Sequence, residues 1–353
     1  MNIRNRCVME FERFLNFLHE KKIICFGAGE GIYGFFDLLR EYQLERYVDF
    51  AVDNSKLKHG KIIKLNSKKI NVYSLEDMYS MISSNHVVLV TCKYYGDISS
   101  QLNGKFNDIP IINYKEIFDS YITSLMQSIN ILDDLKQSEL PEIPKIIHFC
   151  WFGRKPIPSK CMKWMKSWKK FFHDYEIIKW DESNYDITKN SYMKDAYQEG
   201  NFGLVSDYAR LDIIYTYGGI YLDVDVEIIK SWDDLLYNDG FAGMQVDGKI
   251  NLGLGFGAKK GLEIVRIMRD DYDKQTVKNF HTIEEMWEKN CKLCTDIQTG
   301  TLSKYGFVQD GSLLQKIKGL TIYPIPVLNP KIGERFFITK NTYSIHHFEG
   351  TWL

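Results

Sequence analysis

Residues 203–227 constrain the fold of this chain most, because a helix, a glycine turn and an acidic strand follow one another there without a gap. Apolar residues recur at helical spacing and predict one buried stripe: Leu204, Tyr208, Leu211 and Tyr215. Gly218-Gly219 then predicts the end of the helix, since glycine adopts the left-handed C-cap conformation without a Cβ penalty. A single strand is expected to follow, running through Ile228.

The expected strand has a core face and a polar face, because side chains alternate along a strand. The polar face carries Tyr221, Asp223, Asp225 and Glu227. Same-face neighbours on a strand are only about 7 Å apart, so these carboxylates repel one another unless a cation compensates them. In the preceding helix Asp207 and Arg210 are three residues apart and share a face. The alternative is a solvated edge strand beside a surface ion pair.

The run SDYARLDIIYTYGGIYLDVDVE, residues 206–227, resembles the signature of glycosyltransferases with an Asp-x-Asp (DXD) sugar-binding motif. That family includes mannosyltransferases and bacterial capsular-polysaccharide transferases, and the clostridial glucosylating toxins are more distantly similar. The resemblance implies an α/β fold: a GT-A nucleotide-sugar transferase domain. It also implies retention of anomeric configuration and, on family frequency, a UDP-sugar donor.

The resemblance gives the motif residues catalytic roles. Asp225 would bind a divalent metal directly, while Asp223 would reach the donor ribose and a metal-bound water. Asp207 and Arg210 would hold hydroxyls of the donor sugar, and Tyr221 would pack against the donor. Hard oxygen ligands with one imidazole suit Mn²⁺ or Mg²⁺.

Two further segments resemble the family's donor site. In IPKIIHFCWFG, residues 143–153, Trp151 would stack on the donor base while the Phe149–Cys150 backbone reads the base edge; a core role for Trp151 is the alternative. The C-terminal YSIHHFEGTWL looks like a terminal His…Ser-Trp motif with Thr351 in the serine position. His346, or else His347, would complete the metal shell, and Trp352 would cover the diphosphate or sugar. The alternative is an ordinary docked tail.

A glycine-rich segment after the acidic strand predicts an acceptor-side wall, where the backbone approaches closely. Asn251 is a candidate polar contact there. Farther on, Thr299 and Gly300 stand where the family often has Thr-Gly-Pro, but Thr301 replaces the proline and leaves the conformation of that loop open.

The first part of the chain predicts a small Rossmann-like domain. An apolar strand, KKIICF, runs into the glycine-rich turn GAGEGIYG, whose amides could hold a phosphate. Ile32 replaces the third glycine of the dinucleotide fingerprint, although Asp53 lies at a suitable distance to meet a ribose. A structural or docking role is favoured over ligand binding. We expect this domain at 1–118, a helical linker at 119–142 and the GT-A domain at 143–353.

Charge and hydropathy limit the partners. Lys+Arg 45 and Asp+Glu 46 nearly balance, which disfavours binding to nucleic acid. No apolar run approaches the roughly 20 residues that span a bilayer, and the seven cysteines lack a disulfide spacing, so a cytoplasmic location is expected. The basic aromatic segment 159–172 would either pack on the sheet, which is favoured, or touch the inner face of the plasma membrane. Cys291-x-x-Cys294 has no second pair, so zinc or redox use is not favoured.

The resulting hypothesis is a metal-dependent, retaining glycosyltransferase that moves a sugar from a nucleotide sugar to a bacterial surface glycan or a lipid-linked oligosaccharide. One alternative is a metal-dependent phosphohydrolase using Asp223 and Asp225, against which the continuation of the strand through VEII argues. The other is a non-catalytic nucleotide-binding module.

Overall fold

The computed structural model describes residues 10–106, 108–128, 138–277, 292–332 and 335–350. The chain divides into two compact units, Met1–Gln127 and Ser128–Leu353. Helix α5 (Tyr114–Ser128) continues past the predicted end of the first domain at residue 118 and into the predicted linker. Among the described helices, none combines the length and the apolar character that a membrane crossing requires.

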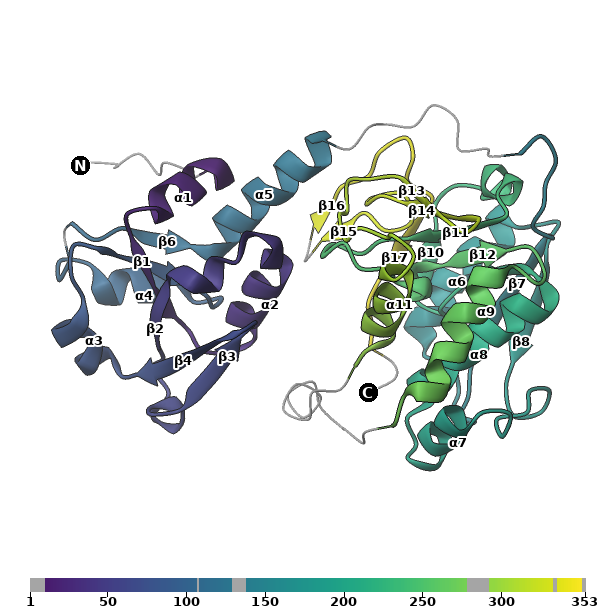
Figure 1. Ribbon diagram of the computed structural model, residues 1–353, viewed down its shortest axis with the longest axis horizontal. Coiled ribbons are helices and arrows are strands. Elements are labelled where there is room, and N and C mark those ends of the chain that lie inside the picture. The colour runs from purple at the N-terminus through teal and green to yellow at the C-terminus, as the bar shows by residue number, and fades with distance from the viewer. Residues whose placement is uncertain (1–9, 107, 129–137, 278–291, 333–334, 351–353) are drawn as a thin grey trace. The chain divides into compact units, whose positions relative to one another are not determined.

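The first unit is built on a six-stranded sheet in the order β3-β4-β2-β1-β5-β6 (Figure 1). All neighbouring strands pair in parallel except β3, which is antiparallel to β4. The strands are β1 (Lys22–Phe26), β2 (Val48–Val52), β3 (Ile62–Leu65), β4 (Lys68–Tyr73), β5 (His86–Val90) and β6 (Ile111–Asn113).

Two separate cores cover the two faces of this sheet. Helices α1 (Phe11–Leu18), α2 (Glu30–Leu38) and α5 pack on one face. Helices α3 (Leu75–Met81) and α4 (Tyr95–Leu102) pack on the other. Strand β1 is buried on both sides, as parallel strands between two helical layers are.

The glycine-rich turn of the first unit is held by the residue expected to meet a ribose. Asp53 accepts hydrogen bonds from the Ala28 amide (2.9 Å), the Ser55 amide (2.9 Å) and the Lys58 ammonium group (2.9 Å). These bonds give Asp53 a structural role in the turn. Ligand binding by this unit stays a prediction.

The second unit contains a seven-stranded mixed sheet in the order β13-β14-β11-β12-β9-β7-β8. Pairing is parallel within β8-β7-β9 and between β11 and β14, whereas β12 is antiparallel to both of its neighbours. The strands are β7 (Ile146–Cys150), β8 (Glu176–Trp180), β9 (Gly219–Tyr221), β11 (Gly240–Gly243), β12 (Phe256–Ala258), β13 (Gln315–Ile317) and β14 (Leu320–Tyr323). The predicted α/β class is confirmed.

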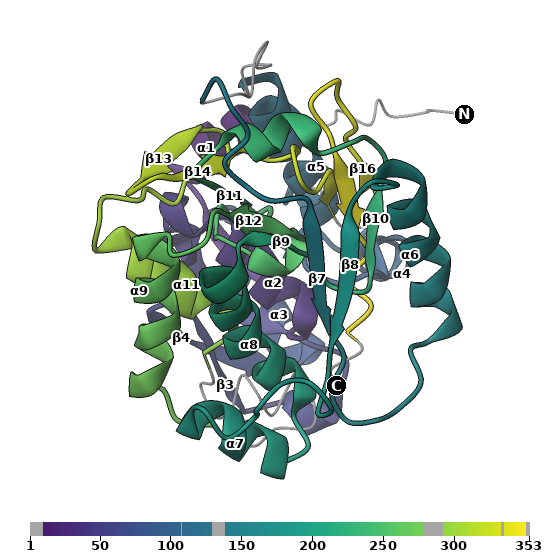
Figure 2. The same cartoon turned by 90° about the vertical axis from the view of Figure 1, so that its right-hand side faces the viewer.

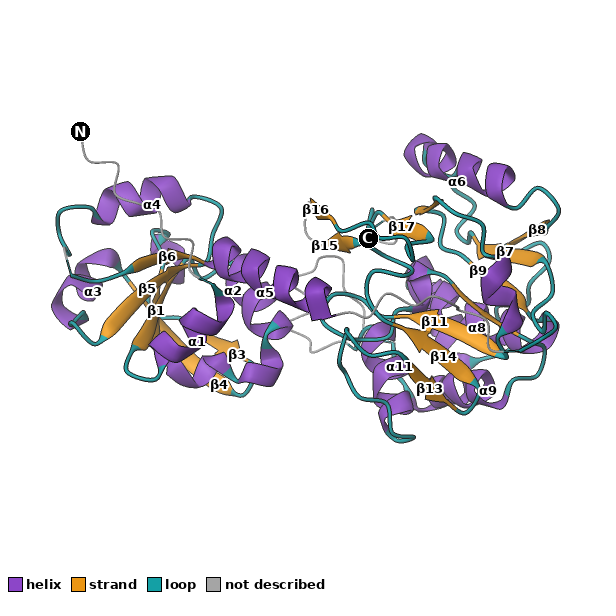
Figure 3. Ribbon diagram, turned by 90° about the horizontal axis from the view of Figure 1, so that it is seen from above, coloured by secondary structure: helices purple, strands orange, loops and turns teal. Residues whose placement is uncertain are grey.

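Two short strand pairs stand apart from the main sheet of the second unit. Strand β10 (Val226–Ile228) pairs antiparallel with β17 (Ser344–His346), and β15 (Lys331–Ile332) pairs with β16 (Arg335–Phe336). Helix α6 (Ser159–Phe171) lies on the opposite side of the main sheet from α8 (Phe202–Tyr217) (Figures 2 and 3). Near α8 lie α7 (Ser191–Gln198), α9 (Glu263–Asp270) and α11 (Cys294–Ser303).

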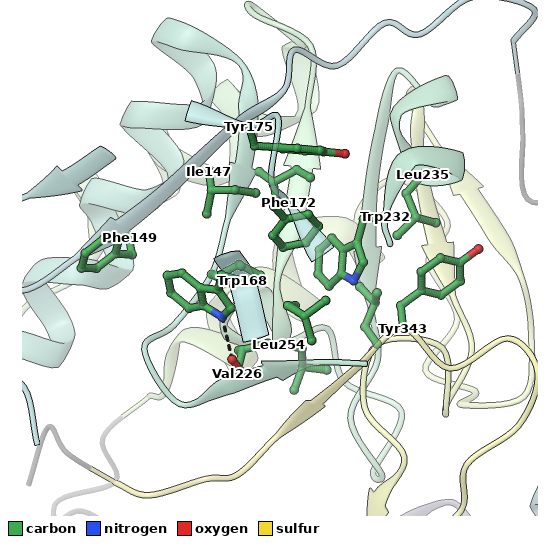
Figure 4. Packing of buried hydrophobic residues seen from close by; sticks show 14 of the residues in the cluster. Ile147, Phe149, Trp168, Phe172, Tyr175, Val226, Trp232, Leu235, Leu254 and Tyr343 are labelled. Atoms are coloured by element: carbon green, nitrogen blue, oxygen red, sulfur yellow. Dashed lines mark hydrogen bonds between the residues drawn. The ribbon is translucent and has the colours of Figure 1, made fainter. Parts of the chain in front are cut away.

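Helix α6 fixes the position of β10 through its buried face. The indole Nε1 of Trp168 donates to the Val226 carbonyl (2.8 Å), and Ser167 Oγ accepts from the Ile228 amide (2.8 Å). Trp168 belongs to a large aromatic and aliphatic core that also contains Trp232 (Figure 4). The segment 159–172 therefore packs against the core as an amphipathic helix, as its apolar spacing predicts.

The predicted continuous acidic strand is wrong in one respect, because the chain turns in its middle. Strand β9 ends at Tyr221, and β10 begins at Val226. The Val226 amide donates to the Asp223 carbonyl (3.1 Å), which closes a turn between the strands. The two halves also have different partners, since β9 joins the main sheet and β10 pairs with β17. Both aspartates therefore lie between two strands.

The start of β9 is held by a buried histidine of β7. His148 accepts a hydrogen bond at Nδ1 from Trp180 Nε1 (3.0 Å), and its Nε2 lies 2.9 Å from the Gly218 carbonyl oxygen. Both contacts are satisfied by a neutral ring that carries its proton on Nε2. Burial lowers the pKa of His148 to about 4, while the bond to Gly218 opposes this shift.

We expect His148 to make the second unit sensitive to acid. The unfolded ring has an ordinary pKa of about 6.5, so its contribution to stability is fully present above that pH and is lost as the pH falls toward 4. The shift corresponds to about 3 kcal/mol of unfolding free energy. Imidazole ¹⁵N NMR should show a neutral His148 ring at pH 5.5 in the folded protein, but a largely protonated one in urea. Protonation of the folded-state ring with a midpoint near 6.5 would contradict this.

Candidate active site

The second unit brings together two carboxylates and an imidazole from distant parts of the chain. The ligand atoms of Asp223, Asp225 and His346 lie within 4.8 Å of one another. Nε2 of His346 is 3.3 Å from Asp225 Oδ1 and 3.8 Å from Asp223 Oδ2. The register of β10 with β17 places Val226 opposite His346 and so carries the ring to the acidic turn. Two carboxylates with one imidazole fit Mn²⁺ or Mg²⁺.

The backbone after β17 closes around Asp225. The His347 amide donates to the Asp225 carbonyl (3.1 Å), and the Glu349 amide donates to its Oδ2 (2.9 Å). The Glu349 carboxylate in turn pairs with Lys160 of α6 (2.6 Å). The C-terminal segment is therefore part of the cluster, while Thr351 and Trp352 lie outside the described residues.

His347, the second choice for a metal ligand, points elsewhere. Its Nε2 lies 2.9 Å from Glu227 Oε2, and its ring stacks on Trp164 of α6 with centroids 3.9 Å apart. Adjacent residues of a strand face opposite ways, so only one of the two histidines can join the aspartates. His346, and not His347, lies beside the two aspartates, and its role as a metal ligand stays a prediction.

Arg210 forms the centre of a buried charge network next to the cluster. Its Nη2 lies 3.1 Å from Asp207 Oδ1 and 3.2 Å from Asp223 Oδ1. The guanidinium carbon lies 4.9 Å from the centre of the Tyr221 ring, whose hydroxyl donates to Asp223 Oδ1 (2.8 Å). The helix and the acidic turn thus share one cation.

Burial and charge shift the acid strengths of this network. Burial raises the pKa of Asp207 to about 6, although Arg210 opposes the shift. Burial alone would raise the pKa of Asp223. Interactions with Arg210, His346 and Tyr221 outweigh this effect, so the pKa of Asp223 is lowered. Asp223 is therefore held as the anion that a metal or a cationic partner requires.

Cys294 contacts this network, which the sequence reasoning missed. Its thiol is hydrogen-bonded to the Asp207 carboxylate, and burial raises its pKa well above the ordinary value. In the sequence, Cys294 stands out only as half of a CxxC pair, and Cys291 lies outside the described residues. The sequence offered no signal for this contact, because it depends on how α11 packs near α8.

Gly253 also borders the acidic turn. A Cβ atom at this position would lie 2.4 Å from Asp223 Oδ2 and 3.0 Å from Asn251 Oδ1, so a side chain here would force the Asp223 carboxylate to move. Asn251 caps the short 3-10 helix η5 (Leu252–Leu254) by accepting from the Gly253 amide (2.8 Å). The run of glycines was the available signal, and it pointed to close backbone approach without identifying Asp223 as the neighbour.

Thr299 and Gly300 lie in helix α11, so the expectation of a loop there is wrong. Thr299 Oγ1 accepts from the Ile250 amide (3.0 Å). Thr301 donates to Asp271 Oδ2 (2.7 Å) and to the Ile297 carbonyl (2.9 Å). With threonine in place of proline, the helix continues through this point. The acceptor-side roles of Asn251, Thr299 and Gly300 stay predictions.

The candidate base-binding residues lie at the end of β7. Phe149 and Cys150 are buried, whereas Trp151 is half-buried and packs against the core. The Trp151 amide donates to the Trp180 carbonyl (2.9 Å) and so ties the end of β7 to β8. Stacking of Trp151 on a base stays a prediction.

Residues 158–242 match the model of the glycosyltransferase sugar-binding region containing the DXD motif. That region includes Asp207, Arg210, Asp223 and Asp225, which converge in the structure as described above. This part of the chain is similar to that glycosyltransferase region. Its resemblance to this family is thereby confirmed.

Curated proteins are similar to the chain over part of their length. The chain is 33% identical over 125 residues to inositol phosphoceramide mannosyltransferase 3 of Schizosaccharomyces pombe, covering 34% of this chain and 35% of the relative. The chain is 30% identical over 137 residues to subversion of eukaryotic traffic protein A of Legionella pneumophila. This match covers 30% of the chain and 21% of that relative. A glycosyltransferase of Acanthamoeba polyphaga mimivirus is 31% identical over 102 residues, covering 27% and 40%. The chain thus spans between 21% and 40% of the length of these relatives.

Two solved glycosyltransferases have a weaker likeness to the chain. The PaToxG glycosyltransferase gives a TM-score of 0.33 at 18% identity, covering 54% of this chain and 77% of that one. A glycosyltransferase involved in the glycosylation of the major capsid of PBCV-1 gives 0.31 at 12% identity, covering 59% and 95%.

Proposed function

We propose that the chain is a metal-dependent, retaining glycosyltransferase that uses a nucleotide sugar, with a UDP-sugar favoured. The acceptor we propose is a bacterial surface glycan such as capsular polysaccharide, or a lipid-linked oligosaccharide. The observation that carries the proposal is the convergence of Asp223, Asp225 and His346 beside the Arg210–Asp207 pair. Retention of configuration is carried over from the family resemblance.

The residues of this site suit the cleavage of a sugar–diphosphate bond. Asp223, Asp225 and His346 would hold Mn²⁺ or Mg²⁺, which when bound supplies positive charge to the leaving diphosphate. Arg210 is fixed by two carboxylates and adds a second positive charge nearby. Charge fixed in place before the reaction stabilises a developing anion without reorganisation. Asp207 would accept hydrogen bonds from hydroxyls of the donor sugar.

A thermal-shift screen of nucleotide sugars with Mn²⁺ tests this proposal. A ligand that binds only the folded state raises the midpoint temperature in proportion to RT ln(1 + [L]/Kd). The panel should contain UDP-glucose, UDP-galactose, UDP-N-acetylglucosamine and GDP-mannose, the last because the fission-yeast relative is named a mannosyltransferase. We expect one donor to stabilise the protein in a metal-dependent way. Stabilisation by none of them, with or without Mn²⁺, would contradict the proposal.

We further propose that the enzyme works in the cytoplasm, against the inner face of the plasma membrane. The outer face of α6 carries exposed Lys163, Lys166, Lys169 and Lys170. In the described part of the chain no carboxylate forms an ion pair with these four lysines. A basic face without neutralising acids attracts anionic lipid, at about 1 kcal/mol for each lysine near the surface.

Replacing these four lysines with glutamine should remove most binding to vesicles that contain phosphatidylserine. Co-sedimentation at low salt measures the effect, and vesicles of phosphatidylcholine alone are the control, to which neither protein should bind. Equal sedimentation of the wild type and the variant with phosphatidylserine vesicles would contradict the membrane contact.

A further inference from the structure

One face of helix α6 contacts both of the chain segments that carry the candidate metal ligands. The residues that make these contacts recur every three or four positions and so share a face of the helix: Lys160, Trp164, Ser167 and Trp168. The last two hold β10 by the hydrogen bonds described above, and the first two contact the segment that follows β17. Asp225 directly precedes β10, and His346 ends β17. A single helix therefore holds both segments.

Trp164 makes the closer of the two contacts with the segment after β17. Its indole ring lies nearly parallel to the imidazole of His347, with an interplanar angle of 9° and centroids 3.9 Å apart. Trp164 is itself a member of the buried core of the second unit. The ring is therefore a fixed surface, and the stack determines where the side chain of His347 lies.

The backbone around His347 transmits this placement to the cluster. The His347 amide donates to the Asp225 carbonyl (3.1 Å), and two residues later the Glu349 amide donates to Asp225 Oδ2 (2.9 Å). His346 is joined directly to His347 by a peptide bond. Groups that orient metal ligands in this way typically account for 10- to 100-fold in metal affinity.

We propose that Trp164 is a positioning residue for the metal cluster and acts through His347. The inference rests on the proposed function, and it adds a residue that touches neither metal nor substrate. By holding His347, Trp164 keeps the Glu349 amide on Asp225 and the His346 ring beside both aspartates. The competing explanation is that Trp164 only stabilises the core, which a metal-binding measurement can separate from positioning.

Trp164→Leu should weaken the binding of Mn²⁺ roughly 10-fold, because it removes the aromatic surface on which His347 stacks. Trp164→Phe keeps an aromatic plane at the same place and should recover most of the affinity. Electron paramagnetic resonance of unbound Mn²⁺, with and without UDP, measures the affinity of the full chain. The temperature should lie well below the unfolding midpoint of every variant.

His347→Ala removes the same stack from the other side and leaves α6 unchanged, so it keeps the inference testable should Trp164→Leu not fold. Its affinity for Mn²⁺ should also fall roughly 10-fold. The double variant should bind no more weakly than His347→Ala alone, because Trp164 acts through His347. Losses that multiply in the double variant, or wild-type affinity in His347→Ala, would overturn the inference.

Phe171→Leu is the matched control for the loss of an aromatic ring from α6. Phe171 is the last residue of the helix and packs against the same core. This variant should unfold at a lower temperature and bind Mn²⁺ like the wild type. Wild-type affinity in Trp164→Leu, or an equal loss in Phe171→Leu, would overturn the inference alone. A wild-type chain that binds no Mn²⁺ in either condition would overturn the proposed metal dependence and the inference with it.

Discussion

Asp225→Asn should lower the rate of sugar transfer by roughly 100-fold or more, the loss that follows removal of one group stabilising a transition-state charge. Asp225 contributes one of the two carboxylates that face His346, and asparagine replaces its negative charge with a weaker neutral ligand. The fold should be little affected, because the asparagine oxygen can still accept from the Glu349 amide as Asp225 does. Initial rates with saturating Mn²⁺ and donor measure the change.

Glu227→Gln is the matched control for this variant. Glu227 belongs to the same row of acids in the sequence, but its carboxylate lies beside His347, outside the cluster of Asp223, Asp225 and His346. Its loss should leave most of the activity. Full transfer by Asp225→Asn in the presence of metal would exclude this cluster as the metal site.

Arg210→Met should destabilise the second unit by about 3 kcal/mol, because it leaves two carboxylates without the buried cation that both contact. The side chain of Arg210 is only 5% exposed and that of Asp207 9%, whereas Asp223 is 28% exposed and keeps part of its hydration. The expected loss is therefore near the lower end for a broken buried ion pair. Denaturant unfolding followed by tryptophan fluorescence measures it.

The double variant Arg210→Met with Asp207→Asn separates stability from catalysis. Removing one of the two uncompensated charges should recover about 1 kcal/mol or more of the loss. Transfer activity should not recover, because both groups proposed to hold the donor sugar are changed. If the double variant is as unstable as Arg210→Met alone, the ion pair with Asp207 does not account for the destabilisation.

The local pattern was sufficient to predict the helix before the acidic turn. Apolar spacing and the glycine pair gave α8 and its end, and Gly218 does adopt a positive φ of 71° as the C-cap. The proximity of Asp207 and Arg210 follows from helical spacing alone, and the pair forms as expected. These features depend on neighbours in the sequence, for which periodicity is a direct guide.

The pairing of β10 with β17 determines features of the site that the sequence pattern does not predict. The alternation through residues 220–228 is compatible with one strand, but β10 leaves the main sheet to pair with β17, more than a hundred residues away. The same pairing chose His346 over His347, because one residue of register reverses the face. The contact of Cys294 with Asp207 depends on helix packing, which no local signal encodes.

Because the strand breaks between β9 and β10, strand continuity does not count against a phosphohydrolase. A continuous acidic strand would argue against that function, but the strand is not continuous. The family match over residues 158–242 and the placement of Arg210 between Asp207 and Asp223 are what favour transfer from a nucleotide sugar.

The most direct measurement is the release of nucleoside diphosphate from the nucleotide-sugar panel, with Mn²⁺ and after chelation by EDTA. Cleavage of one donor by the full chain is expected, dependent on metal, lost in Asp225→Asn and retained in Glu227→Gln. Release of phosphate from simple phosphate esters, with no turnover of any nucleotide sugar, would contradict the account and assign the acidic turn to a phosphohydrolase.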